Sequence, residues 1–167
     1  HAAPAAAPAG APLSVEQLKA EVADGRIDTV IVAITDMQGR LQGKRVHAPY
    51  FVEYVLPHGT EGCNYLLAVD VDMNTVDGYA MSSWDSGYGD FVMRPDLGTL
   101  HRVPWMDGAI GVLYDLELET GGPVLPSPRQ VLKRQLDAHP AVQHPQDPRL
   151  SGCYGTIWFE RLGTAPD

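Results

Sequence analysis

The segment "AIGVLYDLEL", residues 109–118, carries the clearest alternation in the chain and so constrains the fold most. In an extended chain, successive side chains point to opposite faces. One face of this segment is entirely large and apolar, with Ile110, Val112, Tyr114, Leu116 and Leu118. The other face carries Asp115 and Glu117. The alternation predicts a strand with one face against a hydrophobic core and the other in water.

Earlier segments predict a helix and a hairpin. In "SVEQLKAEVADG", residues 14–25, Ser14 is an N-cap with Gln17 at the capping-box position, and Gly25 ends the helix. The β-branched run "DTVIVAITD" (28–36) and the following "RLQGKRVHA" (40–48) predict two strands joined by a tight turn.

Four more elements complete the predicted domain. Pro49 opens "PYFVEYVL", a second short helix with Phe51, Val52 and Val55 inward. "NYLLAVD" (64–70) and "DFVMRPD" (90–96) are predicted strands, and "SPRQVLKRQLDAH" (127–139) is a helix. Its narrow apolar stripe consists of Val131, Leu132, Gln135 and Leu136. The order predicts an α+β fold, a twisted, mostly antiparallel sheet with helices on one face.

Charge and cysteine content narrow the function classes. The 167 residues carry a net charge of −9. Nucleic acid and anionic membranes attract basic surfaces, so we expect neither as a partner. No apolar run reaches the length of a membrane span. Cys63 and Cys153 form no CxxC pair, so we expect neither a disulfide framework nor a zinc site. We expect a cytoplasmic location. Cys63 is expected to be a small buried hydrophobe.

Two weak motifs favour ordinary explanations. "GRLQGKR", residues 39–45, is similar to a phosphate-binding loop, but it is one residue short between the glycines and lies in the predicted hairpin. A basic hairpin arm is the preferred interpretation. The histidines, among them His47, His58 and His101, lack the spacing of metal ligands, so we expect isolated surface or core roles.

Residues 74–96, "NTVDGYAMSSWDSGYGDFVMRPD", begin with a long stretch of Gly, Ser, Asp and aromatic residues. This stretch has no aliphatic periodicity, which predicts an exposed loop, and long loops in compact domains are uncommon unless they have a function. Asp77-Gly78 is either a simple turn or a carboxylate presented for chemistry.

Several ordered segments carry a resemblance to a known family. "TDMQGRLQGKR", "CNYLLAVDVDMN", "DGYAMSSWDSGYGDFVMRPDLGTL", "VPW" and "SPRQVLKRQL" closely resemble the N-terminal β-grasp domain of the glutamine synthetase family, over roughly residues 14–138. The resemblance implies an ATP-dependent glutamate–ammonia or glutamate–amine ligase of nitrogen metabolism that uses Mg²⁺ or Mn²⁺. It also implies a homo-oligomeric ring in which this domain closes the active site of a neighbouring subunit.

The resemblance assigns the loop to the amine pocket. Asp77 stands where the family has its ammonium-binding aspartate, and a carboxylate there can stabilise a cation and accept its proton. The remaining pocket residues implied by the resemblance are Gly78, Tyr79, Ala80, Ser82, Ser83 and Trp84. Tyr79 and Ala80 replace the two serines of ordinary glutamine synthetases, and this departure is similar to enzymes that ligate larger amines.

The expected organisation has four parts: a disordered Ala/Pro leader (1–13), the β-grasp-like domain (14–126), the first helix of a catalytic domain (127–138) and an irregular tail (139–167) unlike the family. The family's Glu-x-Glu metal motif and nucleotide site are absent from the sequence, so we expect the chain to be inactive alone and to bind no cofactor by itself. Two functions stay open: the N-terminal fragment of a ligase, or a non-catalytic module that associates with full-length ring subunits.

Overall fold

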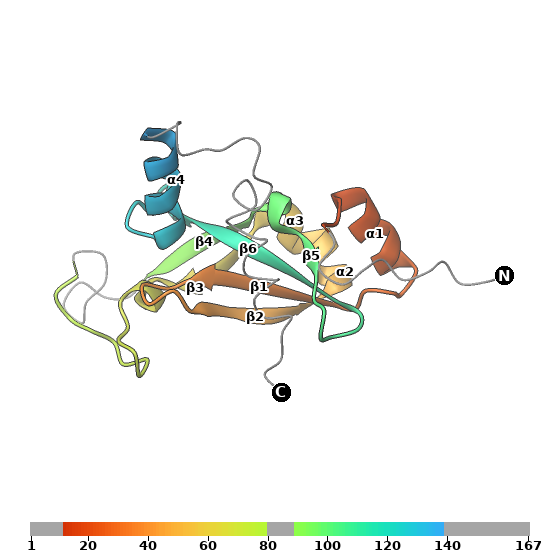
Figure 1. The fold of residues 1–167 in the computed structure, drawn as a ribbon, viewed down its shortest axis with the longest axis horizontal. Coiled ribbons are helices and arrows are strands. Elements are labelled where there is room, and N and C mark those ends of the chain that lie inside the picture. Colours follow the sequence, from red (N-terminus) through yellow and green to blue (C-terminus); the bar gives the residue numbers. More distant parts are fainter. Residues whose placement is uncertain (1–11, 80–88, 139–167) are drawn as a thin grey trace.

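Strand β6 (Ala109–Leu118) lies in the middle of a six-stranded sheet in the computed structural model, which describes residues 12–79 and 89–138 (Figure 1). The order across the sheet is β2-β1-β6-β4-β3, and β5 pairs with the first half of β6. β1 and β6 run parallel, while the other pairs are antiparallel. The other strands are β1 (Thr29–Thr35), β2 (Leu41–His47), β3 (Thr60–Cys63), β4 (Asp90–Pro95) and β5 (His101–Arg102). The predicted α+β class with a mixed sheet is confirmed.

The first two predicted helices are also confirmed. Helix α1 (Val15–Ala23) begins with a complete capping box, in which Ser14 and Gln17 each accept a backbone N–H of the other. The second helical segment runs through three contiguous pieces and ends at Gly59, whose φ of 78° suits glycine. These pieces are α2 (Ala48–Tyr50), the π-helical turn η1 (Phe51–Val55) and α3 (Leu56–His58).

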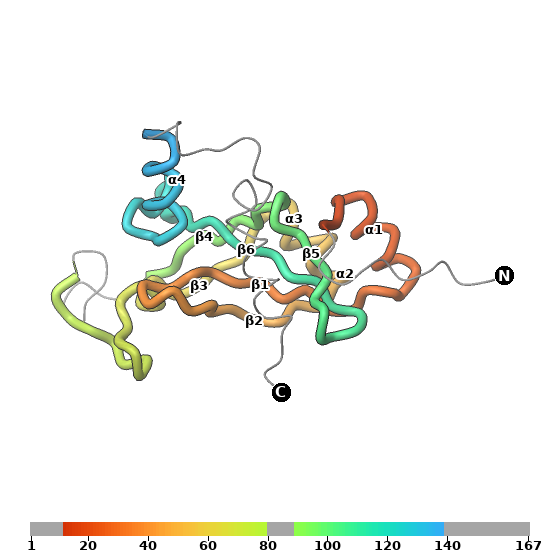
Figure 2. The backbone as a smooth tube through the Cα atoms, in the orientation of Figure 1, coloured from red at the N-terminus to blue at the C-terminus, as the bar shows by residue number. Residues whose placement is uncertain are grey.

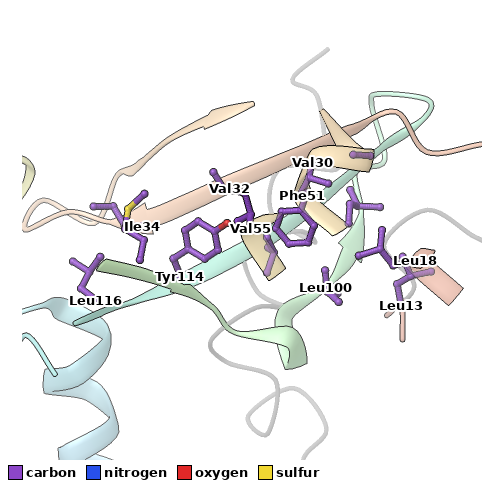
Figure 3. Packing of buried hydrophobic residues seen from close by; sticks show 14 of the residues in the cluster. Leu13, Leu18, Val30, Val32, Ile34, Phe51, Val55, Leu100, Tyr114 and Leu116 are labelled. Carbon is purple, nitrogen blue, oxygen red and sulfur yellow. The ribbon is translucent and has the colours of Figure 1, made fainter. Parts of the chain in front are cut away.

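The main core lies between the sheet and these helices. Figure 3 shows Phe51 and Val55 packed near Val32 of β1 and Tyr114 of β6, and all four side chains are buried. Further along the sheet, Leu18 of α1 joins the same core. The chain enters this core at Leu13, which is buried and whose amide donates to the Leu100 carbonyl at 2.9 Å.

The prediction that β6 has one wet face is wrong. Its apolar face is buried as expected, but Gly111 and Leu113 on the other face are buried too. A second, smaller apolar cluster covers the start of that face, formed by Val103 and Ala109 with Ile31 and Met106. Water therefore reaches only the last part of the strand, where Asp115 and Glu117 are partly exposed and Leu118 is exposed.

Two predictions for residues 60–70 are also wrong. Residues 64–67 form the 3₁₀ turn η2 (Asn64–Leu67) rather than a strand, and the strand β3 precedes it. A short apolar run cannot distinguish a strand from a helical turn, and here the turn buries Leu67. Cys63 is exposed rather than buried, because it ends an edge strand. The Asp90 side chain raises the pKa of Cys63 by accepting a hydrogen bond from the thiol.

Helix α4 (Pro128–Ala138) is attached to the sheet by ion pairs rather than by its apolar stripe. Arg129 is buried and pairs with Asp96 and with Asp115 of β6, and Lys133 also pairs with Asp115. Burial opposes the charge of Asp115, but hydrogen bonds from these two cations outweigh it and lower the pKa of Asp115. The predicted stripe residues Val131 and Leu132 remain exposed.

The Tyr114 hydroxyl supplies a test of the core. It is buried without a hydrogen-bond partner among the described residues, and burial raises the pKa of Tyr114. An unpaired buried hydroxyl costs about 1–3 kcal/mol, so Tyr114→Phe should leave the free energy of unfolding unchanged or raise it by about 1 kcal/mol. Urea unfolding of the two proteins measures this, with Phe51→Leu as a cavity-forming control. A loss above about 1 kcal/mol in Tyr114→Phe would show that the hydroxyl has a partner.

Candidate functional site

A small hairpin, residues 68–76, leads into the predicted site. Val69 and Thr75 form an antiparallel bridge, and the Val76 amide donates to the Ala68 carbonyl at 2.8 Å. The hairpin projects past the sheet end at which β1 turns into β2 (Figure 2). Asp77 follows it directly and is exposed.

The tip of the 68–76 hairpin is organised by Asp70. Its carboxylate accepts the amides of Asp72 and Asn74, both at 2.9 Å, and the Asn74 side chain. Hydrogen bonds from the Asn74 side chain and backbone lower the pKa of Asp70. Met73 adopts a positive φ of 68°, which the turn requires and which a non-glycine residue seldom accepts.

The turn between β1 and β2 holds a buried carboxylate, that of Asp36. One of its oxygens accepts the amides of Gln38 and Arg40 at 2.9 and 2.8 Å. The other accepts Arg40 Nε and Gln42 Nε2, each at 2.7 Å. Burial raises the pKa of Asp36, but these hydrogen bonds outweigh it, so the pKa lies below the ordinary value.

Arg40 and Gln38 connect this turn to the 68–76 hairpin. The Arg40 guanidinium donates to the carbonyls of Val71 and Asp70 at 2.6 and 3.0 Å, while Gln38 Nε2 donates to the Val69 carbonyl at 2.8 Å. The sequence predicted a basic hairpin arm here, and the hairpin is confirmed. The connection across about 30 residues was not predicted, and its local signal is an aspartate before a tight Gly-Arg turn.

The structure describes three of the seven predicted site residues. Asp77, Gly78 and Tyr79 are exposed, and Gly78 has a φ of 96°. The predicted pocket residues Ala80, Ser82, Ser83 and Trp84 lie outside the described residues. Asp77 and Tyr79 thus place a carboxylate and an aromatic side chain on the surface, directly after the 68–76 hairpin.

Histidines and acidic residues give no metal centre in the part of the chain that the structure describes, where no group of three or more could hold an ion. His58 Nδ1 lies 2.9 Å from the Tyr54 carbonyl, and the buried His101 Nδ1 lies 2.9 Å from the Thr99 carbonyl. The described residues therefore do not fit the divalent metals that the family resemblance implies. Within the same ranges, no helix is long and apolar enough to cross a membrane.

Comparisons with known proteins are consistent with one another. The chain is 66% identical over 126 residues to a gamma-glutamylethanolamide synthetase of Streptomyces coelicolor, covering 75% of this chain and 27% of the relative. It is 39% identical over 134 residues to a glutamate–isopropylamine ligase of a Pseudomonas species, covering 80% and 28%. Human lengsin is 30% identical over 131 residues, covering 73% and 24%. The chain thus spans about a quarter of the length of these relatives. No family model matches it.

Solved structures share the fold. A GmaS–ADP complex superimposes with a TM-score of 0.56 at 21% identity, covering 74% of this chain and 25% of that chain. A glutamine synthase homolog gives 0.56 at 19% identity, covering 70% and 27%. The described domain is of the class found at the N-terminus of glutamine-synthetase-like proteins. Together with the sequence relatives, this places the chain in the glutamine synthetase family.

Asp36→Asn tests the buried carboxylate. Because the variant removes a charge that several donors satisfy, it should lower the free energy of unfolding by about 2–4 kcal/mol at pH 7. A carboxylate with a lowered folded pKa stabilises fully above its unfolded pKa, about 4, and loses that contribution as the pH falls through the folded pKa. The gap between wild type and variant should therefore narrow below about pH 4.

Urea unfolding between pH 7 and pH 3 measures this gap. Asp24→Asn is the control, because Asp24 is an exposed partner of Arg26 and should change stability by less than about 1 kcal/mol. A gap for Asp36→Asn that stays constant down to pH 3 would contradict the role given to its charge.

Proposed function

We propose that this chain is the N-terminal part of an ATP-dependent glutamate–amine ligase and supplies the amine-binding loop to a neighbouring subunit. The observation that carries the proposal is the exposed Asp77 carboxylate, which directly follows a hairpin clamped to the sheet. An exposed carboxylate next to a hairpin that is fixed to the sheet can enter a site formed by a neighbouring subunit. The relatives named for γ-glutamyl-amine chemistry support the same activity class.

Exposed apolar side chains on the hairpin support a partner surface. Val71 is 70% exposed and Met73, Val76 and Tyr79 are between 39% and 48% exposed. A contiguous group of exposed apolar side chains is typical of an interaction site. We infer that the catalytic domain of a second subunit in a homo-oligomeric ring covers it.

Asp77 would act on the amine in two ways. Its carboxylate would attract the protonated amine into the pocket, and desolvation by the covering subunit would strengthen that attraction. The carboxylate would then accept one proton from the ammonium group, which leaves a neutral amine with a free electron pair. That nitrogen can attack the γ-carboxyl carbon of glutamate that ATP has phosphorylated, so that the C–N bond forms, the C–O bond to phosphate breaks and phosphate leaves. ATP with Mg²⁺ or Mn²⁺ would activate glutamate, and residues outside those described would bind them.

The amine is proposed to be larger than ammonia. The two relatives with the highest identity quoted above are named for ethanolamide and isopropylamine products or substrates. Tyr79, directly after Asp77-Gly78, is an exposed aromatic side chain next to the proposed amine-binding carboxylate. An aromatic surface favours an alkylated amine, because the alkyl group buries apolar area that ammonia does not have.

Asp77→Ala tests the proposal in a chimera in which residues 12–138 replace the matched segment of the Streptomyces coelicolor relative. Turnover should fall by about 10²–10⁴-fold for a lost general base, with the KM for ATP nearly unchanged. Thermal unfolding should hardly change, because Asp77 is exposed.

Asp72→Ala is the matched control, since Asp72 is an exposed aspartate on the same hairpin. It should leave amine kinetics unchanged. If Asp77 is only a turn residue, Asp77→Ala will instead change stability by up to about 1 kcal/mol and leave turnover intact. That result would remove Asp77 from the amine site.

A further inference from the structure

The segment that carries Asp77 depends on contacts from elsewhere for its position. Residues 71–79 are all exposed, whereas Ala68 and Val69 just before them are buried. Beyond Val69, the Arg40 side chain bonds the backbone at Asp70 and Val71, and Gln42 Nε2 lies 3.1 Å from Met73 Sδ. Arg40 of the β1–β2 turn and Gln42 of β2 thus contact the part of the hairpin that is not buried.

Arg40 is well suited to fix a backbone. Its Nε is held on the Asp36 carboxylate at 2.7 Å, and Asp36 is fully buried, so the plane of the guanidinium is set by the core of the domain. The two terminal nitrogens then donate to the carbonyls of Val71 and Asp70. A lysine has the charge but not the planar fork that spans three acceptors.

We propose that Arg40, oriented by Asp36, is the positioning residue of the amine site. It fixes the direction in which the 68–76 hairpin leaves the sheet and so the place at which Asp77 meets the neighbouring subunit. This inference rests on the proposed function. Arg40 need not touch the amine, because a displacement of about 1 Å in a positioned group can cost about 100-fold in rate.

Hydrogen exchange on the 167-residue chain tests the structural half. In Arg40→Gln, the amides of Met73, Asn74 and Val76, which are bonded within the hairpin, should exchange at least about tenfold faster, corresponding to a loss of about 1.4 kcal/mol of local stability. Arg40→Lys should also accelerate exchange, which separates geometry from charge. The amides of β6 should be unaffected.

Arg94→Gln is the matched control. Arg94 also pairs through Nε with a carboxylate, that of Glu117 at 3.1 Å, and donates to a backbone carbonyl, that of His58 at 2.6 Å. It lies on β4, and these two hydrogen bonds go to β6 and α3 rather than to the hairpin, so exchange at residues 73–76 should not change. Because Arg40→Gln removes the charged partner of a buried carboxylate, the double variant Asp36→Asn/Arg40→Gln is measured as well, and it should show the same local acceleration.

Kinetics of the chimera test the functional half. Arg40→Gln and the double variant should raise the KM for the amine at least about tenfold while the KM values for glutamate and ATP stay within about twofold. Unchanged exchange in the hairpin would overturn the positioning role. Faster exchange with an unchanged amine KM, while Asp77→Ala does impair amine use, would also overturn it. If Asp77→Ala has no effect on amine use either, the proposed function itself fails.

Discussion

Strand β6 is hydrogen-bonded along both edges, to β1 on one side and to β5 and β4 on the other, and the rest of the domain is placed relative to it. Its apolar face meets the helical segment 48–58, and its opposite face carries Asp115, which holds α4 through Arg129 and Lys133. Because β6 is paired on both edges, its neighbours cannot easily shift their register along it. The register of β1 against β6 therefore also fixes the position of the end of β1.

At the end of β1, one buried carboxylate orders the turn into β2. Asp36 follows the strand, is buried, and accepts four hydrogen bonds, from Gln38 and Arg40 of the turn and from Gln42 of β2. A buried carboxylate that is so completely bonded is a rigid acceptor, and it converts Arg40 from a mobile basic side chain into a fixed bridge. The bridge carries the rigidity of the sheet to the otherwise exposed 68–76 hairpin.

Large apolar side chains are exposed at several places on the domain, although the core between sheet and helices is closed. Val71 and Met73 are exposed on the 68–76 hairpin, Val131 and Leu132 on α4, and Tyr50 and Tyr54 on the helical segment 48–58. The exposed apolar group on the hairpin is the one that adjoins Asp77, and the proposed contact with a neighbouring subunit rests on it.

The sequence by itself determined the elements whose signals are local. The capping box of Ser14, the β-branched run of β1 and the alternation of β6 each act within a few residues, and all were predicted. The family was predicted as well, and the relatives confirm it, whereas the role of Asp77 stays a prediction. Tertiary structure alone decided that β6 is buried on both faces, that residues 64–67 coil into a turn, and that Arg40 reaches a hairpin some 30 residues away. These outcomes depend on which segments become neighbours, and no periodicity in one segment records the identity of its partner in space.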